Sequence, residues 1–275
     1  MMNFKFLNHH PKFKWKIYHL YRFFYDFINI LNKNNSAPLG KTFVGGGNFE
    51  KVGQEFFQYF LNFCNIKSSS KILDIGSGMG RMAIPFTTFL DENGIYEGFD
   101  VFKSGIRWSQ KNITTKFSNF HFSYIDIFNK EYNPDGKIHA TTFTFPYPDN
   151  YFDVVFATSV FTHLLPLDLP KYFSEIYRVL KPNGTCFLTF LLLNPESNQL
   201  IQNKQSHILF EHFEDKYALM IHDVPEHTIA YDENYVRSIH ETTNLVMTDP
   251  IFYGSWCGRN NFLSFQDIII SKKYN

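Results

Sequence analysis

The chain has 275 residues, 44% of them hydrophobic, and its 26 basic and 26 acidic residues cancel to a formal net charge of zero. This length suits one large α/β domain or a domain with additions, and the 33 phenylalanines supply enough apolar surface for a sizeable core. Without net charge the chain has no global field that favours nucleic acid, so we expect no nucleic-acid partner.

The cysteine content and the N-terminal hydropathy bear on the cellular compartment. Cys64, Cys186 and Cys257 lie far apart, without the spacing of a metal or redox motif. They indicate packing thiols in a reducing compartment, so we expect a cytoplasmic protein. The apolar stretch over residues 17–31 is too short to span a bilayer and contains charged side chains. It lacks a small-residue cleavage site, so no secretory signal is expected.

Residues 1–35 combine basic and aromatic side chains with a single acid, Asp26. Two interpretations stay open: a helix packed on the domain, or an amphipathic segment lying on an anionic membrane surface or near a lipid-linked substrate. The second would make the protein peripheral to the membrane, and vesicle binding by full-length and N-truncated protein distinguishes the two. Pro38, Gly40 and the run Gly45–Gly47 then predict a loop, so we place a boundary between a segment of residues 1–47 and a domain of residues 48–275.

Strand and helix patterns alternate after this loop. Asn48 can cap a helix whose phenylalanines recur at helical spacing up to Phe63. The next segments are predicted strands at residues 71–75, 95–100, 120–127, 152–159 and 185–193, and predicted helices at residues 104–116 and 169–180. This alternation implies a parallel sheet with crossover helices, which binds its ligands outside the carboxyl ends of the strands.

The C-terminal part begins with an irregular stretch. Residues 194–231 are too long for an ordinary connection and predict a lid or substrate-binding insertion. A helix over residues 232–243 and strands over residues 245–252 and 265–271 follow. Histidines are frequent between His207 and His240, but their spacing matches no common zinc motif, so we expect no metal.

The run KILDIGSGMGR, residues 71–81, is the most informative part of the chain. It places Asp74 near the end of a short apolar strand, and Gly76, Gly78 and Gly80 in the turn toward a helix. Glycines let the backbone approach a ligand in conformations that a Cβ forbids, and a helix start offers unpaired N–H groups. The spacing is D-x-G-x-G-x-G, so the third glycine comes one residue earlier than in the dinucleotide fingerprint G-x-G-x-x-G.

This run resembles motif I of the class I S-adenosylmethionine-dependent methyltransferases of small-molecule type. Residues 151–164, YFDVVFATSVFTHL, resemble the fourth strand of that family with its following loop, and residues 178–184, RVLKPNG, resemble the turn before its fifth strand. The resemblance is close over residues 49–193 and loose over the last two strands. It implies a Rossmann-like α/β fold: a seven-stranded, mostly parallel sheet with an antiparallel last strand and helices on both faces.

The resemblance also implies S-adenosyl-L-methionine as the cofactor. Asp100 ends the second strand, where the family places an acid on the ribose hydroxyls, and a carboxylate can accept both in charge-assisted bonds. Asp126 lies where the family often places an acid on the adenine amino group. The expected cofactor-binding residues are Asp74, Gly76, Ser77, Gly78, Gly80, Arg81, Asp100, Val101, Asp126, Ile127, Thr158 and Ser159.

His163 follows the fourth strand and is the candidate general base, because an alcohol nucleophile benefits from a base that works near neutral pH. The alternative is a structural histidine that caps the next helix or bonds a backbone carbonyl. Tyr253, Trp256 and Arg259, in the loop between the last two strands, are expected to line the acceptor pocket. The alternative for them is packing under the insertion.

The expected activity is methyl transfer to a small or conjugated acceptor, such as a sugar, a lipid or a metabolite, with O-methylation preferred on account of His163. Methyltransferases of DNA bases resemble one another in an Asn/Asp-Pro-Pro-aromatic motif, whereas this chain has Ala157-Thr158-Ser159-Val160 there. Two alternatives are a nicotinamide-dependent oxidoreductase, against which the glycine spacing argues, and a non-catalytic S-adenosylmethionine-binding protein.

Overall fold

The structure, a computed structural model, describes residues 48–274. Both interpretations of residues 1–35 concern residues outside this range. Gly47–Asn275 form one compact unit. None of the helices in the described part of the chain is long and apolar enough to cross a membrane.

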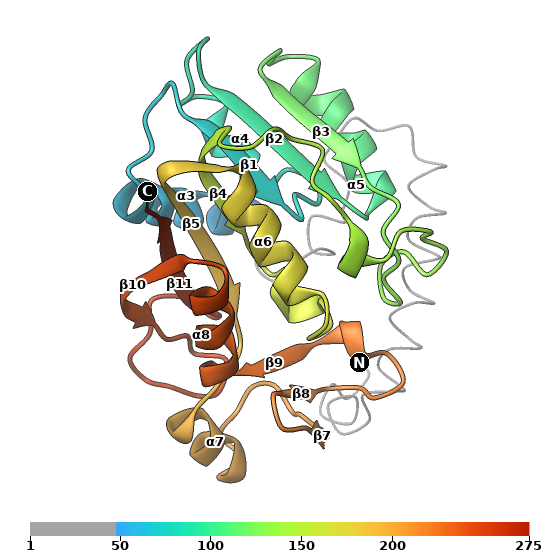
Figure 1. The fold of residues 1–275 in the computed structure, drawn as a ribbon, viewed down its shortest axis with the longest axis vertical. Coiled ribbons are helices and arrows are strands. Elements are labelled where there is room, and N and C mark those ends of the chain that lie inside the picture. The colour runs from blue at the N-terminus through green and yellow to red at the C-terminus, as the bar shows by residue number, and fades with distance from the viewer. Residues whose placement is uncertain (1–47, 275) are drawn as a thin grey trace. The chain divides into compact units, whose positions relative to one another are not determined.

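A seven-stranded sheet forms the centre of this unit. Its strands are β1 (Lys71–Ile75), β2 (Ile95–Asp100), β3 (Phe120–Tyr124), β4 (Phe152–Ala157), β5 (Leu180–Phe190), β10 (Leu245–Phe252) and β11 (Asp267–Lys273). Their order is β10-β11-β5-β4-β1-β2-β3 (Figure 1). Neighbours from β5 to β3 are parallel, and β11 is antiparallel to both β5 and β10. The predicted sheet with an antiparallel last strand is confirmed.

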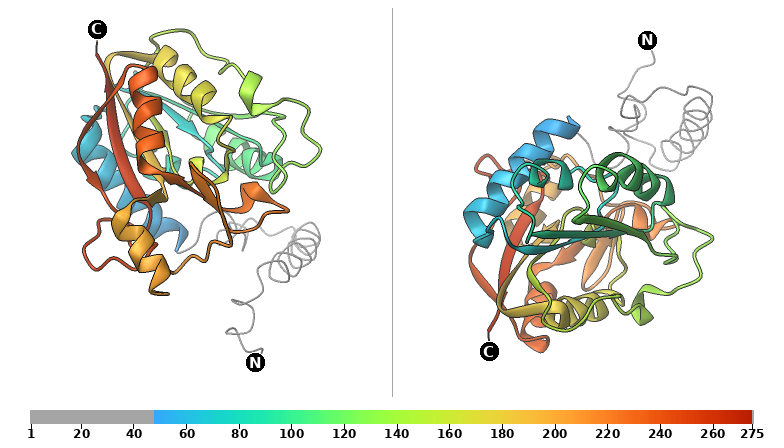
Figure 2. Two further views of the ribbon diagram at one scale, coloured as in Figure 1. Left: turned by 60° about the horizontal axis from the view of Figure 1, so that its bottom comes forward. Right: turned by 90° about the horizontal axis from the view of Figure 1, so that it is seen from above.

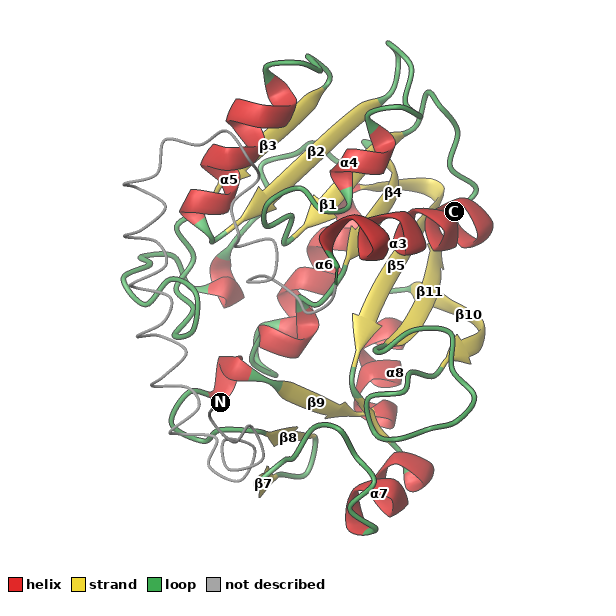
Figure 3. Ribbon diagram, turned by 180° about the vertical axis from the view of Figure 1, so that it is seen from behind, coloured by secondary structure: helices red, strands yellow, loops and turns green. Residues whose placement is uncertain are grey.

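Helices cover both faces of the sheet, as predicted (Figures 2 and 3). One face carries α3 (Phe49–Cys64), α4 (Ala83–Phe86) and α5 (Lys103–Ser109), and the other carries α6 (Leu169–Val179) and α8 (Glu233–Thr242). Phe60 of α3 stacks on Phe156 of β4 with ring centroids 4.2 Å apart. The Asn48 side chain caps α3 by accepting a hydrogen bond from Lys51 N–H at 3.0 Å, which confirms the predicted helix start.

The inserted segment, predicted as a lid or substrate-binding insertion from its irregular pattern, forms a second sheet. After α7 (Pro195–Gln202), strands β7 (His212–Phe213), β8 (Tyr217–Leu219) and β9 (Ile229–Asp232) join β6 (Leu192–Leu193) in the order β6-β9-β8-β7. None of these strands exceeds four residues, too few for a readable alternation of apolar and polar side chains. In Figure 1 this sheet lies beyond the carboxyl ends of the parallel strands.

Several predicted element boundaries differ from the structure, including β5 at Leu180–Phe190 against the predicted residues 185–193, and two of the differences have a local cause. The third strand stops at Tyr124 because Asp126 leaves the sheet, and its carbonyl accepts hydrogen bonds from Lys137 N–H and Ile138 N–H, both at 2.9 Å. The predicted helix over residues 104–116 is the short α5 continued by a π-helix over Gln110–Thr114. Both departures follow from local hydrogen bonds that periodicity does not reveal.

His240 in α8 makes the stability of the fold depend on pH. Its ring packs edge-on against Phe173 with centroids 4.7 Å apart, and its Nδ1–H donates to the Val236 carbonyl. Burial lowers the pKa of His240 from 6.5 to about 4. The unfolded chain therefore takes up this proton near pH 6.5 and the folded protein only near pH 4, so the free energy of unfolding falls as the pH falls through this window.

We expect His240→Leu to reduce the loss of unfolding free energy between pH 7 and pH 5 by about 2 kcal/mol, because leucine removes the proton uptake. Urea unfolding at the two pH values measures the difference. His121→Leu is the control, because His121 is exposed on β3. Equal pH dependence in His240→Leu and the unsubstituted protein would contradict the assignment.

Candidate functional site

The glycine turn after β1 is held against the end of β2. Gly76 N–H donates to the Phe99 carbonyl at 2.9 Å. Gly76, Gly78 and Gly80 have φ angles of 74°, 53° and 71°, in the left-handed region that favours glycine. A Cβ on Gly76 would lie 2.4 Å from Val160 Cγ2, so this position also has no room for a side chain. All three positions therefore favour glycine because of their positive φ, and Gly76 also lacks space for a side chain.

Asp100, at the end of β2, closes the turn. Its Oδ2 accepts from Gly78 N–H and its Oδ1 from Phe102 N–H, both at 2.6 Å. Burial raises the pKa of the Asp100 carboxyl, and these backbone hydrogen bonds oppose the rise. A carboxylate offers about four lone-pair sites, so about two remain for donors on a ligand. Asp100 is thus both a fixed part of the turn and an available acceptor.

Gly98 and Gly105 bring the neighbouring elements into contact with the turn, and the sequence analysis missed both. A Cβ on Gly98 would lie 2.8 Å from Ser77 Cβ, and one on Gly105 would lie 2.7 Å from the Gly78 carbonyl oxygen. A glycine inside a strand pattern often marks such a close approach, so the IYEGFD pattern of β2 contained a usable signal for Gly98.

Gly105→Ala is expected to weaken binding of S-adenosylmethionine about tenfold, because the added methyl displaces the Gly78 carbonyl. Overpacking costs about 1–3 kcal/mol, partly offset by the higher helix propensity of alanine, so the protein should stay folded. Calorimetric titration measures the affinity. Ser104→Ala, on the exposed side of α5, is the matched control, and equal affinity of both variants would contradict the expectation.

Asp74 lies in the core below the turn, which corrects its predicted role as a cofactor ligand. It is 1% exposed, and its Oδ2 accepts from the Tyr96 hydroxyl at 2.6 Å. Within residues 48–274 its Oδ1 has no hydrogen-bond partner. Burial raises the pKa of the Asp74 carboxyl well above its usual range, which favours the neutral form. Asp74 supports the turn from inside the protein.

Asp126 lies beside the end of β2, since Ile125 N–H donates to the Asp100 carbonyl at 3.0 Å. Its Oδ1 accepts from the Tyr124 hydroxyl at 2.7 Å, and this bond lowers the pKa of Asp126. The carboxylate therefore stays ionised next to Asp100. The side chain of Ile127 is 2% exposed and belongs to the core, so only its backbone could meet a ligand.

The other predicted cofactor residues lie around the turn at different depths. Ser77 is 5% exposed, and its Oγ has no hydrogen-bond partner among the described residues. The Arg81 guanidinium lies 5.3 Å from the centre of the Phe49 ring, and burial lowers its pKa. Three half-buried residues complete the set, namely Val101, Thr158 and Ser159.

Thr189 of β5 holds the loop after β4 through a hydrogen bond. Ser159 has a φ angle of 58°, and its N–H donates to Thr189 Oγ1 at 2.8 Å. The Thr189 hydroxyl in turn donates to Gln266 Oε1 at 2.6 Å. This chain of bonds holds the segment that continues to Val160, whose side chain lies against Gly76.

His163 ends a short 3-10 helix, Phe161–His163, directly after this loop. Its Nδ1 lies 2.9 Å from the backbone carbonyl of Glu226. Because a carbonyl only accepts, Nδ1 carries the proton and Nε2 keeps a lone pair. Burial lowers the pKa of His163 below 6.5. The neutral imidazole therefore dominates at neutral pH, with its basic nitrogen defined.

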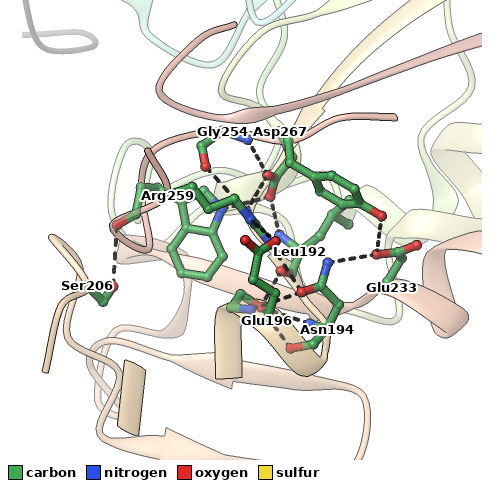
Figure 4. Close-up of polar contacts among 11 residues, drawn as sticks. Leu192, Asn194, Glu196, Ser206, Glu233, Gly254, Arg259 and Asp267 are labelled. Atoms are coloured by element: carbon green, nitrogen blue, oxygen red, sulfur yellow. Dashed lines mark hydrogen bonds and ion pairs between the residues drawn. The ribbon is translucent and has the colours of Figure 1, made fainter. Parts of the chain in front are cut away.

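Trp256 and Arg259 belong to a buried polar network, which corrects their predicted place in an acceptor pocket (Figure 4). Asp267, 0% exposed at the start of β11, accepts from Trp256 Nε1 at 2.7 Å and from Arg259 Nη1 at 3.2 Å. Arg259 also pairs with Glu196 of α7 at 2.8 Å. These contacts join α7 of the inserted segment to β11, as the packing alternative predicts. Tyr253 is half-buried, 4.8 Å from the Arg259 guanidinium.

No group of three or more histidine, cysteine, aspartate or glutamate residues within residues 48–274 is arranged to hold a metal ion. The three cysteines are buried and free. Asp100 ends β2, Asp126 follows β3 and His163 follows β4, so all three lie at the carboxyl ends of parallel strands.

Comparison with known sequences agrees with this geometry. A family model described as a methyltransferase domain matches residues 73–188. A phosphoethanolamine N-methyltransferase from Arabidopsis thaliana is 25% identical over 177 residues, which cover 64% of this chain and 32% of that protein. A phosphoethanolamine N-methyltransferase from Plasmodium falciparum is 25% identical, covering 54% and 48%. A sterol 24-C-methyltransferase from Gibberella zeae is 26% identical, covering 52% and 33%. The chain spans about a third to a half of the length of these relatives.

Solved structures share the fold. A protein from Pyrococcus horikoshii superimposes with a TM-score of 0.57 at 15% identity, covering 88% of this chain and 100% of that chain. An S-adenosylmethionine-dependent methyltransferase from Methanosarcina mazei superimposes with a TM-score of 0.51 at 15% identity, covering 78% and 97%. Residues 73–188 thus match a methyltransferase domain, and the glycine turn and the sheet order are those expected of the class I S-adenosylmethionine-dependent methyltransferases, which this chain resembles in sequence and in fold.

Proposed function

We propose that this chain transfers a methyl group from S-adenosylmethionine to a small-molecule acceptor. The observation that carries the proposal is the contact between the two halves of the site. Val160 lies against Gly76 of the glycine turn, and His163 follows Val160 by one short turn. The candidate base and the candidate cofactor turn therefore share one edge of the sheet.

The residues around the turn fit the cofactor. The glycines hold the turn in a positive-φ conformation, and Asp100 keeps acceptor capacity for the ribose hydroxyls. Ionised Asp126 suits the adenine amino group. Ser77 stays a proposed contact of the turn, although its Oγ is buried. The remaining proposed contacts are Val101, Thr158, Ser159 and the backbone of Ile127. When bound, S-adenosylmethionine supplies an activated methyl group on a sulfonium.

His163 acts as the general base in this proposal. Its Nε2 takes the proton of the acceptor, while its Nδ1–H stays bonded to the Glu226 carbonyl. The remaining task of the protein is to align the acceptor with the methyl group and to exclude water. Tyr253, half-buried at the same edge, stays a proposed acceptor contact.

We propose an acceptor whose nucleophile is a hydroxyl or an amino group, since both release a proton that a neutral imidazole can take. The preference for O-methylation rests on His163 alone. The names of the similar phosphoethanolamine N-methyltransferases support including amines. A carbon nucleophile, as in the name of the similar sterol methyltransferase, is the second candidate.

Transfer of a labelled methyl group from S-adenosylmethionine into a fractionated metabolite extract tests the proposal. A labelled small molecule, identified by mass spectrometry and absent with heat-denatured protein, supports it. Saturable cofactor binding with no labelled product would show a non-catalytic binding protein. Binding of NAD without binding of S-adenosylmethionine would contradict the proposed cofactor site.

A further inference from the structure

We propose that the turn Pro225–His227 of the second sheet sets the tautomer of His163, with Glu226 as a positioning residue. The catalytic meaning of this inference rests on the proposed function. The geometry that supports it can be tested without cofactor or acceptor.

Glu226 contacts the site through two different groups. Its backbone carbonyl accepts from His163 Nδ1–H at 2.9 Å. Its side chain is 5% exposed, and Oε1 accepts from Lys130 N–H in the loop after β3 at 3.2 Å. Glu226 thus orients the His163 imidazole through its carbonyl and binds the loop after β3 through its carboxylate.

His227 lies in the same turn, beside a buried carboxylate. Its Nδ1 lies 3.4 Å from Oε2 of Glu131, a carboxylate that is 3% exposed in the loop after β3. The two groups lie close together, but His227 Nδ1 makes no hydrogen bond with a described residue. The turn is therefore held to this loop by the Glu226 carboxylate, and His227 lies beside Glu131 of the same loop.

The loop after β3 also holds His163 directly. Asn129 Nδ2 donates to the His163 carbonyl at 3.0 Å, and Asn129 Oδ1 accepts from Tyr132 N–H at 2.9 Å. The Tyr132 ring meets the imidazole edge-on with centroids 5.2 Å apart. Two segments distant in sequence therefore contact the imidazole, and of these only the turn Pro225–His227 contacts a ring nitrogen among the hydrogen bonds of the described residues.

The consequence for the chemistry follows from the two ring nitrogens. An imidazole with no acceptor at Nδ1 populates the tautomer that carries its proton on Nε2, and that nitrogen then cannot take a proton. The Glu226 carbonyl removes this tautomer. The second sheet, which lacks every sequence motif of the cofactor site, is thereby part of the catalytic arrangement.

Nitrogen-15 NMR of the imidazole in the free protein, at a pH where it is neutral, tests the inference. The unsubstituted protein should show one tautomer, protonated on Nδ1. Glu226→Ala, which loosens the turn, should show a mixture of tautomers and a kcat about tenfold lower, with the KM for S-adenosylmethionine unchanged, since small misplacements of a catalytic group are costly. Glu226→Gln keeps the Oε1 acceptor and should restore both values.

Glu214→Ala removes an exposed glutamate from the same inserted segment and is the matched control. If Glu226→Ala fails to fold, Glu131→Gln loosens the turn through His227, and the same change of tautomer is expected. A single Nδ1–H tautomer with full kcat in the loosened variant would overturn the inference. Failure of the proposed function would instead appear as absent methyl transfer with the tautomer result intact.

Discussion

Asp100→Asn is expected to weaken binding of S-adenosylmethionine about 100-fold. A hydrogen bond to a charged group contributes about 1.5–3 kcal/mol, so two ribose hydroxyls on one carboxylate account for about 3 kcal/mol or more. Asparagine has a single acceptor oxygen, and Gly78 N–H and Phe102 N–H already compete for it. Its NH₂ group would face one of these N–H donors, which disturbs the turn as well.

Calorimetric titration with S-adenosylmethionine, below the thermal transition of each variant, measures this effect. Glu97→Gln is the matched control, because it removes a carboxylate from the same strand that faces His121 instead of the turn. The control should bind with unchanged affinity. If Asp100→Asn binds within threefold of the unsubstituted protein, Asp100 does not hold the ribose.

His163→Ala is expected to lower kcat by about 100- to 10,000-fold, the usual contribution of a general base, with cofactor affinity within about threefold. We expect kcat to change without the cofactor affinity, because His163 follows β4 whereas the cofactor turn follows β1 and Asp100 ends β2. Initial rates with the acceptor identified by methyl labelling measure kcat, and calorimetry measures affinity. A kcat within threefold of the unsubstituted value would remove His163 from the mechanism.

The pH dependence of the rate is a second test of His163 as the general base. The neutral imidazole is the active base, and burial lowers the pKa of His163 below 6.5. The rate should therefore be constant through neutral pH and fall only as the pH drops through that lowered pKa. His121→Ala, on the exposed end of β3, should keep both the rate and the profile. A midpoint above pH 6.5 would contradict the assignment.

The features that sequence predicts well are those that depend on residues close together in the chain. The glycine turn was recognisable because Gly76, Gly78 and Gly80 must adopt positive φ, and few other residues do so without strain. Asp100 is predicted from the family resemblance, which places an acid at the end of the second strand, and the structure shows its carboxylate bonded to Gly78 N–H of the turn.

The predictions that failed concern side chains whose surroundings come from distant segments. Asp74 is predicted as a cofactor ligand, but it lies in the core, where its carboxyl accepts a hydrogen bond from Tyr96 of the adjacent strand. Trp256 and Arg259 looked like pocket residues, but Asp267 and the helix α7 surround them. Burial depends on what packs over a residue, and no local pattern records that.

The amino-acid sequence by itself determined the strand–helix alternation and the glycine turn, because each is specified within a few residues along the chain, and the family resemblance added the acid at the end of the second strand. Only the tertiary structure decided which groups meet at His163. The loop after β3, the helix after β4 and the turn Pro225–His227 come together by packing of the second sheet, whose strands are too short to leave a pattern. The tautomer of one imidazole is thus a property of the whole fold, since its hydrogen-bond acceptor lies 63 residues away.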